Sequence, residues 1–169
     1  MRRRSRGKRA RHVFGARILE LGNLENEALG IEIGYRYDDS PVVYHENAAP
    51  PAYEMAKYTP STWPGIRAPS VFLSDGTAIL DRLDTGFTLL RFADLDVRSL
   101  EGAAAARGVP LCIVDIRDEK ARAIYQRDLV LVRPDQHVAW RGDAEPGNSL
   151  AVIDRVRGAI PSRIAASRR

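Results

Sequence analysis

The side chains that most often carry metal or redox chemistry are few in this sequence and far apart. The one cysteine, Cys112, cannot form an internal disulfide, and it lies in the apolar run LCIVDI, where a cysteine is usually a small buried hydrophobe. The histidines His12, His45 and His137 lack the spacing of a metal site. No nucleophile elbow, phosphate loop or GxGxxG turn is present. The sequence therefore predicts no catalytic, cofactor-binding or metal-binding residue.

The elements that would position such residues form a regular series between residues 71 and 160. Strand patterns occupy 87–92, 111–116, 128–134 and 137–142, with a short one in SVFL, and helix patterns occupy 78–83, 97–107, 119–126 and 149–160. The first βαβ unit must be parallel and right-handed, and the last two strands form a hairpin. This order, βαβ, then α, then ββα, predicts an α/β thioredoxin-like domain. We expect a mixed four-stranded sheet in the order 111–116, 87–92, 128–134, 137–142.

The junction after the first strand is where a thioredoxin carries two cysteines two residues apart. Here the junction reads Ala93-Asp94-Leu95-Asp96. Two acids would raise the pKa of a thiol at this position, whereas redox chemistry needs it lowered. Asp96 is better interpreted as the N-cap of the following helix, and Arg127-Asp128 stand where redox proteins of this fold place a proline. We expect the fold without the redox site, and a single-cysteine redox protein using Cys112 stays an alternative.

Upstream of this domain lies a connector rich in proline and tyrosine, residues 16–70. It begins with a helical pattern over 18–28, and GIEIGYRY then alternates apolar and polar residues, which predicts a short strand with one buried face, followed by a turn and a returning strand at 41–44. Five prolines between 48 and 70 exclude a helix or a central strand there. We expect an extended segment whose aromatic side chains pack on other domains; these are Tyr35, Tyr37, Tyr53, Tyr58 and Trp63.

Charge is distributed unevenly along the chain. Seven basic residues lie among residues 1–11, and the formal net charge of +4 becomes −3 when they are left out. No apolar stretch typical of a secretory signal follows them. We expect residues 1–15 to be a disordered basic tail and residues 161–169 a second tail, outside a connector at 16–70 and a domain at 71–160. A nucleic-acid-binding protein acting through residues 1–11 stays a second alternative, although the rest of the chain offers no second basic face.

Several blocks of the sequence, in a consistent order, resemble the C-terminal part of FAD-dependent aromatic-ring hydroxylases. They are LGIEIGYRYDDSPVV and YTPSTWPGIRAPSVFLSDG in the connector, and GFTLLRF, AAAARGVPL, DLVLVRPDQHVAWRG and VIDRVRG in the domain. One departure is Ser70, where the family would have a histidine after RAP. Gly142-Asp143 resembles the pair with which these flavoproteins hold the FAD ribityl chain, but it leaves a hairpin, so we interpret Asp143 as a loop residue.

The resemblance implies a thioredoxin-like C-terminal domain that lacks the redox cysteines and serves structure or subunit contacts. The full-length family has an N-terminal FAD domain and hydroxylates phenolic or polyketide rings with NAD(P)H and O₂. For the isolated chain we expect no cofactor, a non-catalytic role, a cytoplasmic location, and either a FAD-domain partner or self-association through the connector. We expect neither a nucleic-acid partner nor a membrane partner.

Overall fold

The computed structural model describes residues 2–26 and 28–159, which fall into two compact units. The first combines Met1–Gly34 with Ala52–Thr59, and the second combines Tyr35–Pro51 with Pro60–Arg169. The first contains helix α1 (Arg2–Asn26) and the short helix α2 (Leu29–Glu32). No helix among the described residues is long and apolar enough to cross a membrane.

The second unit is built on one mixed sheet. Its elements are η1 (Ile79–Arg82), β1 (Phe87–Arg91), α3 (Arg98–Ala106), β2 (Leu111–Asp115), α4 (Glu119–Tyr125), β3 (Leu129–Val132), β4 (Val138–Gly142) and α5 (Ser149–Val156). The strand order is β2-β1-β3-β4. The pair β1 and β2 is parallel and the other two pairs are antiparallel. The predicted thioredoxin-like fold and sheet order are therefore confirmed.

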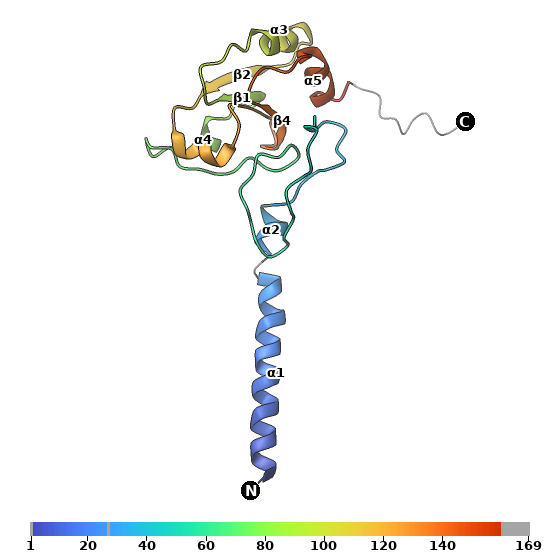
Figure 1. Ribbon diagram of the computed structural model, residues 1–169, viewed down its shortest axis with the longest axis vertical. Coiled ribbons are helices and arrows are strands. Elements are labelled where there is room, and N and C mark those ends of the chain that lie inside the picture. The colour runs from blue at the N-terminus through green and yellow to red at the C-terminus, as the bar shows by residue number, and fades with distance from the viewer. Residues whose placement is uncertain (1, 27, 160–169) are drawn as a thin grey trace, which may run out of the picture. The chain divides into compact units, whose positions relative to one another are not determined.

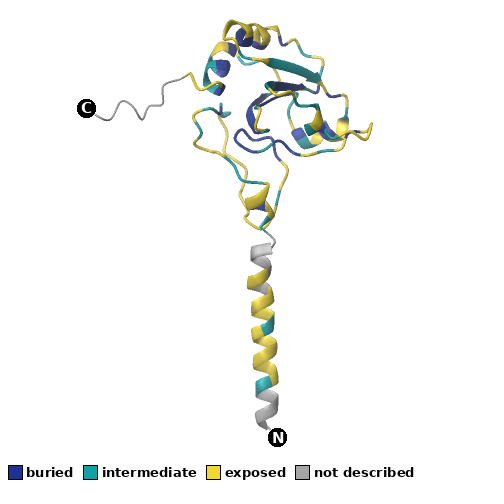
Figure 2. Ribbon diagram, turned by 180° about the vertical axis from the view of Figure 1, so that it is seen from behind, coloured by how far each residue is buried: buried dark blue, intermediate teal, exposed yellow. Residues whose placement is uncertain are grey.

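Alternation along the strands gives the sheet two buried faces, each covered by different helices (Figure 1). Leu89 and Leu131 lie on the face covered by α3 and α5, whereas Leu90 and Val130 lie on the face covered by α4 and η1. All four residues of β3 are buried because it is a central strand (Figure 2). Burying each such leucine or valine side chain contributes about 1.5–3 kcal/mol.

The short strand predicted over residues 31–37 is wrong. The backbone N–H groups of Ile31 and Glu32 both donate to the carbonyl of Ala28, which makes a helical turn. The alternating Ile31 and Ile33 are 48% and 37% exposed, so no buried face holds them in an extended strand. Only one bridge, between Arg36 and Ile66, forms in this segment.

Three smaller predictions also differ from the structure. Residues 41–44 form no strand, although the N–H of Tyr44 donates to the carbonyl of Ala139 in β4. The run SVFL forms a single bridge between Phe72 and Ala78 instead of a strand. The expected helix at 78–83 is the short 3₁₀ helix η1, whose N-cap residue Ala78 makes no side-chain cap.

Helix α1 begins inside the segment expected to be a disordered tail. Its described side chains from Lys8 to Phe14 are exposed (Figure 2). Arginine, lysine, leucine and alanine are all good helix formers, which favours a helix here despite the high density of positive charge. The predicted boundary at residue 15 does not coincide with an end of this helix. The predicted tail at 161–169 lies outside the described residues.

Removal of residues 1–11 should leave the melting temperature of the second unit within about 4 °C of the intact chain, because exposed charged side chains contribute little burial. Thermal denaturation followed by circular dichroism measures this difference. A larger fall would mean that these residues pack on the folded unit.

Candidate functional site

The amino end of α3 is where a thioredoxin-like protein would hold a reactive thiolate, and here it holds carboxylates. The backbone N–H of Arg98 donates to Oδ1 of Asp96 over 3.1 Å, and the Arg98 guanidinium pairs with the same group. These hydrogen bonds from Arg98 hold the pKa of Asp96 at about 2. The predicted N-cap role is displaced by one residue: Val97 occupies the N-cap position and Asp96 caps from just upstream.

A second carboxylate, from a residue later in the sequence, lies at the same helix end. Glu145, in the loop between β4 and α5, accepts a hydrogen bond from the backbone N–H of Leu100 over 2.8 Å. Ser99 and Ser149 also lie within hydrogen-bond distance of each other, 2.7 Å. Sequence reasoning missed Glu145, because no local pattern indicates a cap supplied 45 residues further along. The positive end of the helix dipole is thus already engaged by two fixed negative groups.

Cys112 lies on β2, opposite Thr88 of β1. The thiol was expected to be buried, but the residue is only half-buried, because β2 is an edge strand of the sheet. Its Sγ is 3.9 Å from the carbonyl oxygen of Ile113. Asp94 and Asp96 lie in the loop between β1 and α3, whereas Cys112 lies on β2. The two acids and the thiol therefore belong to different elements.

The chain should not catalyse the reduction of insulin disulfides by dithiothreitol, because dithiol exchange needs a second cysteine that the sequence lacks. The turbidity assay should give the uncatalysed rate for both the intact chain and Cys112→Ser. A rate above background that disappears in Cys112→Ser would contradict this expectation.

Asp143 follows β4 directly and acts as an anchor within the protein. Its Oδ1 accepts a hydrogen bond from the backbone N–H of Asp128 over 3.1 Å, and its carboxylate lies 3.5 Å from both Arg122 and Arg127. Arg122 also pairs with Asp128 over 2.5 Å. These contacts fix the entry to β3 and support the interpretation of Asp143 as a loop residue.

The outer edge of β4 is covered by the connector. The N–H of Gly65 donates to the carbonyl of Val138 over 2.8 Å, and the N–H of Val138 donates to the carbonyl of Ile66 over 2.9 Å. The N–H of Ala68 donates to the carbonyl of Gln136 over 2.8 Å. An edge strand that would otherwise invite association is therefore paired within the chain.

Arg141 is the buried charge that joins the connector to the sheet. Its side chain is only 7% exposed and forms an ion pair with Glu46. It donates to Oγ1 of Thr62 over 3.2 Å and lies over the Trp63 ring, 5.3 Å from the ring centre. Arg127 binds the other oxygen of Glu46 over 3.1 Å. We call this group, Glu46, Thr62, Trp63, Arg127 and Arg141, the connector lock.

The connector lock corrects one expectation for the aromatic residues. Trp63 was expected to pack on other domains, but it is 4% exposed and packs within this chain. Tyr37 and Tyr53 stay 51% and 45% exposed, and Tyr35 is half-buried against Tyr37 and His137. Burial and then the neighbouring Tyr37 raise the pKa of Tyr35.

Glu46 is ionised more readily than a free glutamate. Partial burial alone would raise its pKa, but the hydrogen bonds from Arg141 and Arg127 outweigh this and lower the pKa below its usual value. A group whose folded pKa is lowered stabilises the fold above the pKa of the unfolded group. That stabilisation is lost as the pH falls through the folded pKa.

Glu46→Gln should lower the free energy of unfolding at pH 7 by about 3–5 kcal/mol, because it leaves Arg141 buried without its counter-charge. The difference from the intact chain should shrink as the pH falls through the lowered pKa of Glu46, because Glu46 itself then becomes protonated. Urea denaturation at several pH values measures both effects. Glu101→Gln, an exposed glutamate on α3, is the matched control and should change little. A constant difference across the pH range would show that Glu46 acts through packing alone.

His45 and His137 contact different aromatic residues. His45 lies beside Trp63, with ring centres 6.2 Å apart, and His137 lies in the β3–β4 turn against Tyr35 and Tyr37. A cavity of about 210 Å³ is lined by His137 together with Tyr37, Ser40, Val43, Arg133 and Asp135. Within the described parts of the chain, no three histidine, cysteine or acidic side chains gather in a way that could hold a metal ion.

Comparison with protein families identifies a match over residues 61–159. The matching family model is described as "Aromatic-ring hydroxylase, C-terminal". Among curated proteins, the FAD-dependent monooxygenase apdD of Emericella nidulans is 38% identical over 128 residues, which is 70% of this chain and 20% of that protein. Phenol 2-monooxygenase of a Pseudomonas species is 30% identical over 94% of this chain and 30% of that protein. The chain thus spans less than a third of the length of these relatives.

Solved structures give the same result. RebC with bound 7-carboxy-K252c superposes with a TM-score of 0.78 at 39% identity, covering 92% of this chain and 29% of that one. The flavin-dependent monooxygenase PieE, in complex with FAD and substrate, superposes with a TM-score of 0.67 at 30% identity, covering 79% of this chain and 27% of that one.

Proposed function

We propose, since the chain belongs to the aromatic-ring hydroxylase family as its C-terminal domain, that it is a non-catalytic module that supports a FAD-bearing part outside these residues. The single observation that carries this proposal is the amino end of α3, where Asp96 and Glu145 occupy the position of the thioredoxin thiolate. The fold keeps its sheet and helices, and at that end the carboxylates of Asp96 and Glu145 accept hydrogen bonds from the backbone of α3.

The residues present do not fit FAD. Tight dinucleotide binding needs a glycine-rich turn between a strand and a helix, with free N–H groups at the helix end for the pyrophosphate. The only right-handed parallel βαβ unit in the described chain, β1-α3-β2, has no glycine in its first turn. Two carboxylates already accept from the N–H groups of α3 and would repel a diphosphate.

FAD in a full-length hydroxylase, reduced by NAD(P)H, supplies the oxygen chemistry, and this chain would contribute no reacting atom. Its part is to supply a surface on the second unit, held by the connector lock, where the exposed Tyr37 can contact the FAD-bearing part or a second copy. The single cysteine suits a reducing compartment, so we propose that the chain works in the cytoplasm.

The chain purified with excess FAD should be colourless after gel filtration and should not oxidise NADPH or NADH when phenolic substrates are added. Absorbance at the flavin wavelengths and loss of the nicotinamide signal measure these outcomes. The positive control is a complete relative such as phenol 2-monooxygenase, which should retain flavin through the same procedure. Stoichiometric flavin on the 169-residue chain would refute a non-catalytic role.

A further inference from the structure

We propose that one face of α1 is the docking surface for the FAD-bearing part of an aromatic-ring hydroxylase, an inference that rests on the proposed function. The face consists of apolar residues at three- and four-residue spacing, which places them on one side of a helix. They are Ala10, Val13, Phe14, Ile18 and Leu21, and we call them the α1 stripe.

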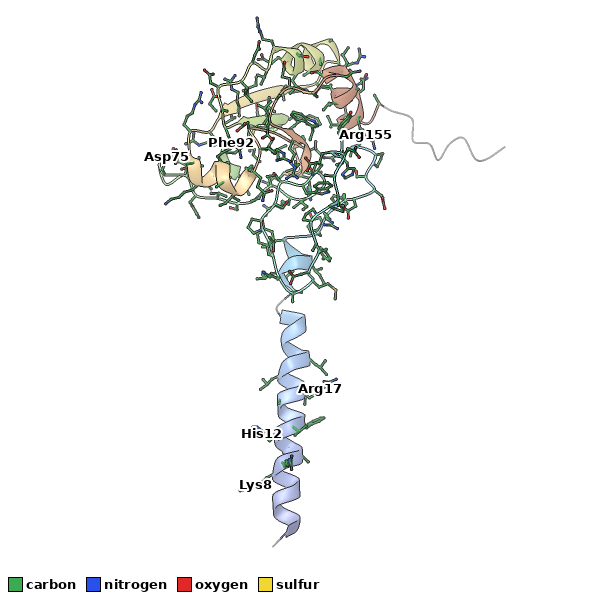
Figure 3. All side chains as sticks on the ribbon, viewed as in Figure 1. Lys8, His12, Arg17, Asp75, Phe92 and Arg155 are labelled. Atoms are coloured by element: carbon green, nitrogen blue, oxygen red, sulfur yellow. The ribbon has the colours of Figure 1, made fainter. Side chains whose placement is uncertain are left out.

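The α1 stripe is open to solvent in the described structure. Val13, Phe14, Ile18 and Leu21 are 62%, 67%, 53% and 55% exposed, and most of the described part of α1 is coloured as exposed in Figure 2. Arg9 and Arg17 border a shallow hollow formed with Ala10, Val13 and Phe14. Figure 3 shows Lys8 and His12 on the side of the helix away from Arg17. The exposed Leu19 also lies off the stripe.

The superposition on RebC supports the FAD-bearing part as the neighbour of the α1 stripe. The superposition on RebC covers 92% of a 169-residue chain, which is not possible if all 25 residues of α1 are left out. At least part of α1 therefore belongs to the hydroxylase architecture, although the C-terminal family model begins only at residue 61. The match takes 29% of RebC, a protein solved with reduced flavin, and the family model is described as C-terminal, so we infer that the flavin-bearing chain precedes the matched part. That preceding part is the neighbour that α1 meets first.

Charge favours this occupant over a second copy of the chain. Helix α1 contains eight basic and two acidic residues, so two parallel copies would repel each other. A partner groove with an apolar floor and an acidic rim would match the stripe and its flanking Arg9 and Arg17. Anionic membranes and nucleic acids also attract basic helices, and the test below treats each as a separate outcome.

The experiment measures binding of the full 169-residue chain to FAD-loaded RebC from which the segment matching this chain has been removed. Phe14→Asp and the milder Phe14→Gln should each weaken binding by about ten-fold or more, as for an apolar residue at the centre of an interface. Leu19→Asp is the matched control, because Leu19 is 66% exposed on the same helix but lies off the stripe. It should change affinity by no more than about two-fold. Circular dichroism of each variant checks that α1 remains helical.

The outcomes separate this inference from the proposed function. If the intact chain binds truncated RebC and the Phe14 variants bind as well as Leu19→Asp, the docking surface is elsewhere and only this inference fails. If the intact chain does not bind truncated RebC, the partner claim of the proposed function fails together with the inference. Phe14-dependent binding to phosphatidylserine vesicles or to DNA, without binding to truncated RebC, would replace the FAD-bearing partner by a membrane or a nucleic acid.

Discussion

The burial of Arg141 is the constraint on which the rest of the second unit depends. A guanidinium with 7% of its side chain exposed must be paired, since an uncompensated buried charge costs about 3–5 kcal/mol. Glu46 supplies the counter-charge and Trp63 the ring face, and both come from the connector. Residues 35–51 and 60–70 of the connector are therefore part of the second unit, and the β4 edge is closed by Gly65 and Ile66, which lie more than 70 positions upstream of Val138.

Several polar groups of the second unit are engaged by contacts within the fold. Carboxylates occupy the amino end of α3, the connector covers β4, and Asp143 is held by Arg122 and Arg127. These contacts support the proposed non-catalytic role. We expect function at surfaces that the fold leaves open, and the α1 stripe offers four exposed apolar side chains on one helix.

The sequence predicts elements well where the hydrophobic pattern has one clear period. It does not predict structure that depends on contacts between residues far apart in the chain. The strands over 87–142 combine apolar runs with clear turns, so their order followed from connection rules alone. Residues 31–37 alternate apolar and polar side chains as a strand does, but a strand would form only if its apolar face were buried. The local packing is different: Gly30 lies so close to the carbonyl of Glu54 that a Cβ at this position would clash. Trp63 and Glu145 find their partners far along the chain, and no local pattern shows that. The helical pattern predicted over 18–28 overlaps the last part of α1, but the arginine run before it suggested disorder, so the start of α1 at Arg2 was not predicted.

We propose docking through α1 and a structural role for the loop between β1 and α3. Hydrogen–deuterium exchange of the 169-residue chain, with and without FAD-loaded truncated RebC, tests this most directly. The account predicts slower amide exchange within residues 10–21 and unchanged exchange within residues 94–100 when the partner is present. Protection of 94–100 with no change in α1 would contradict it.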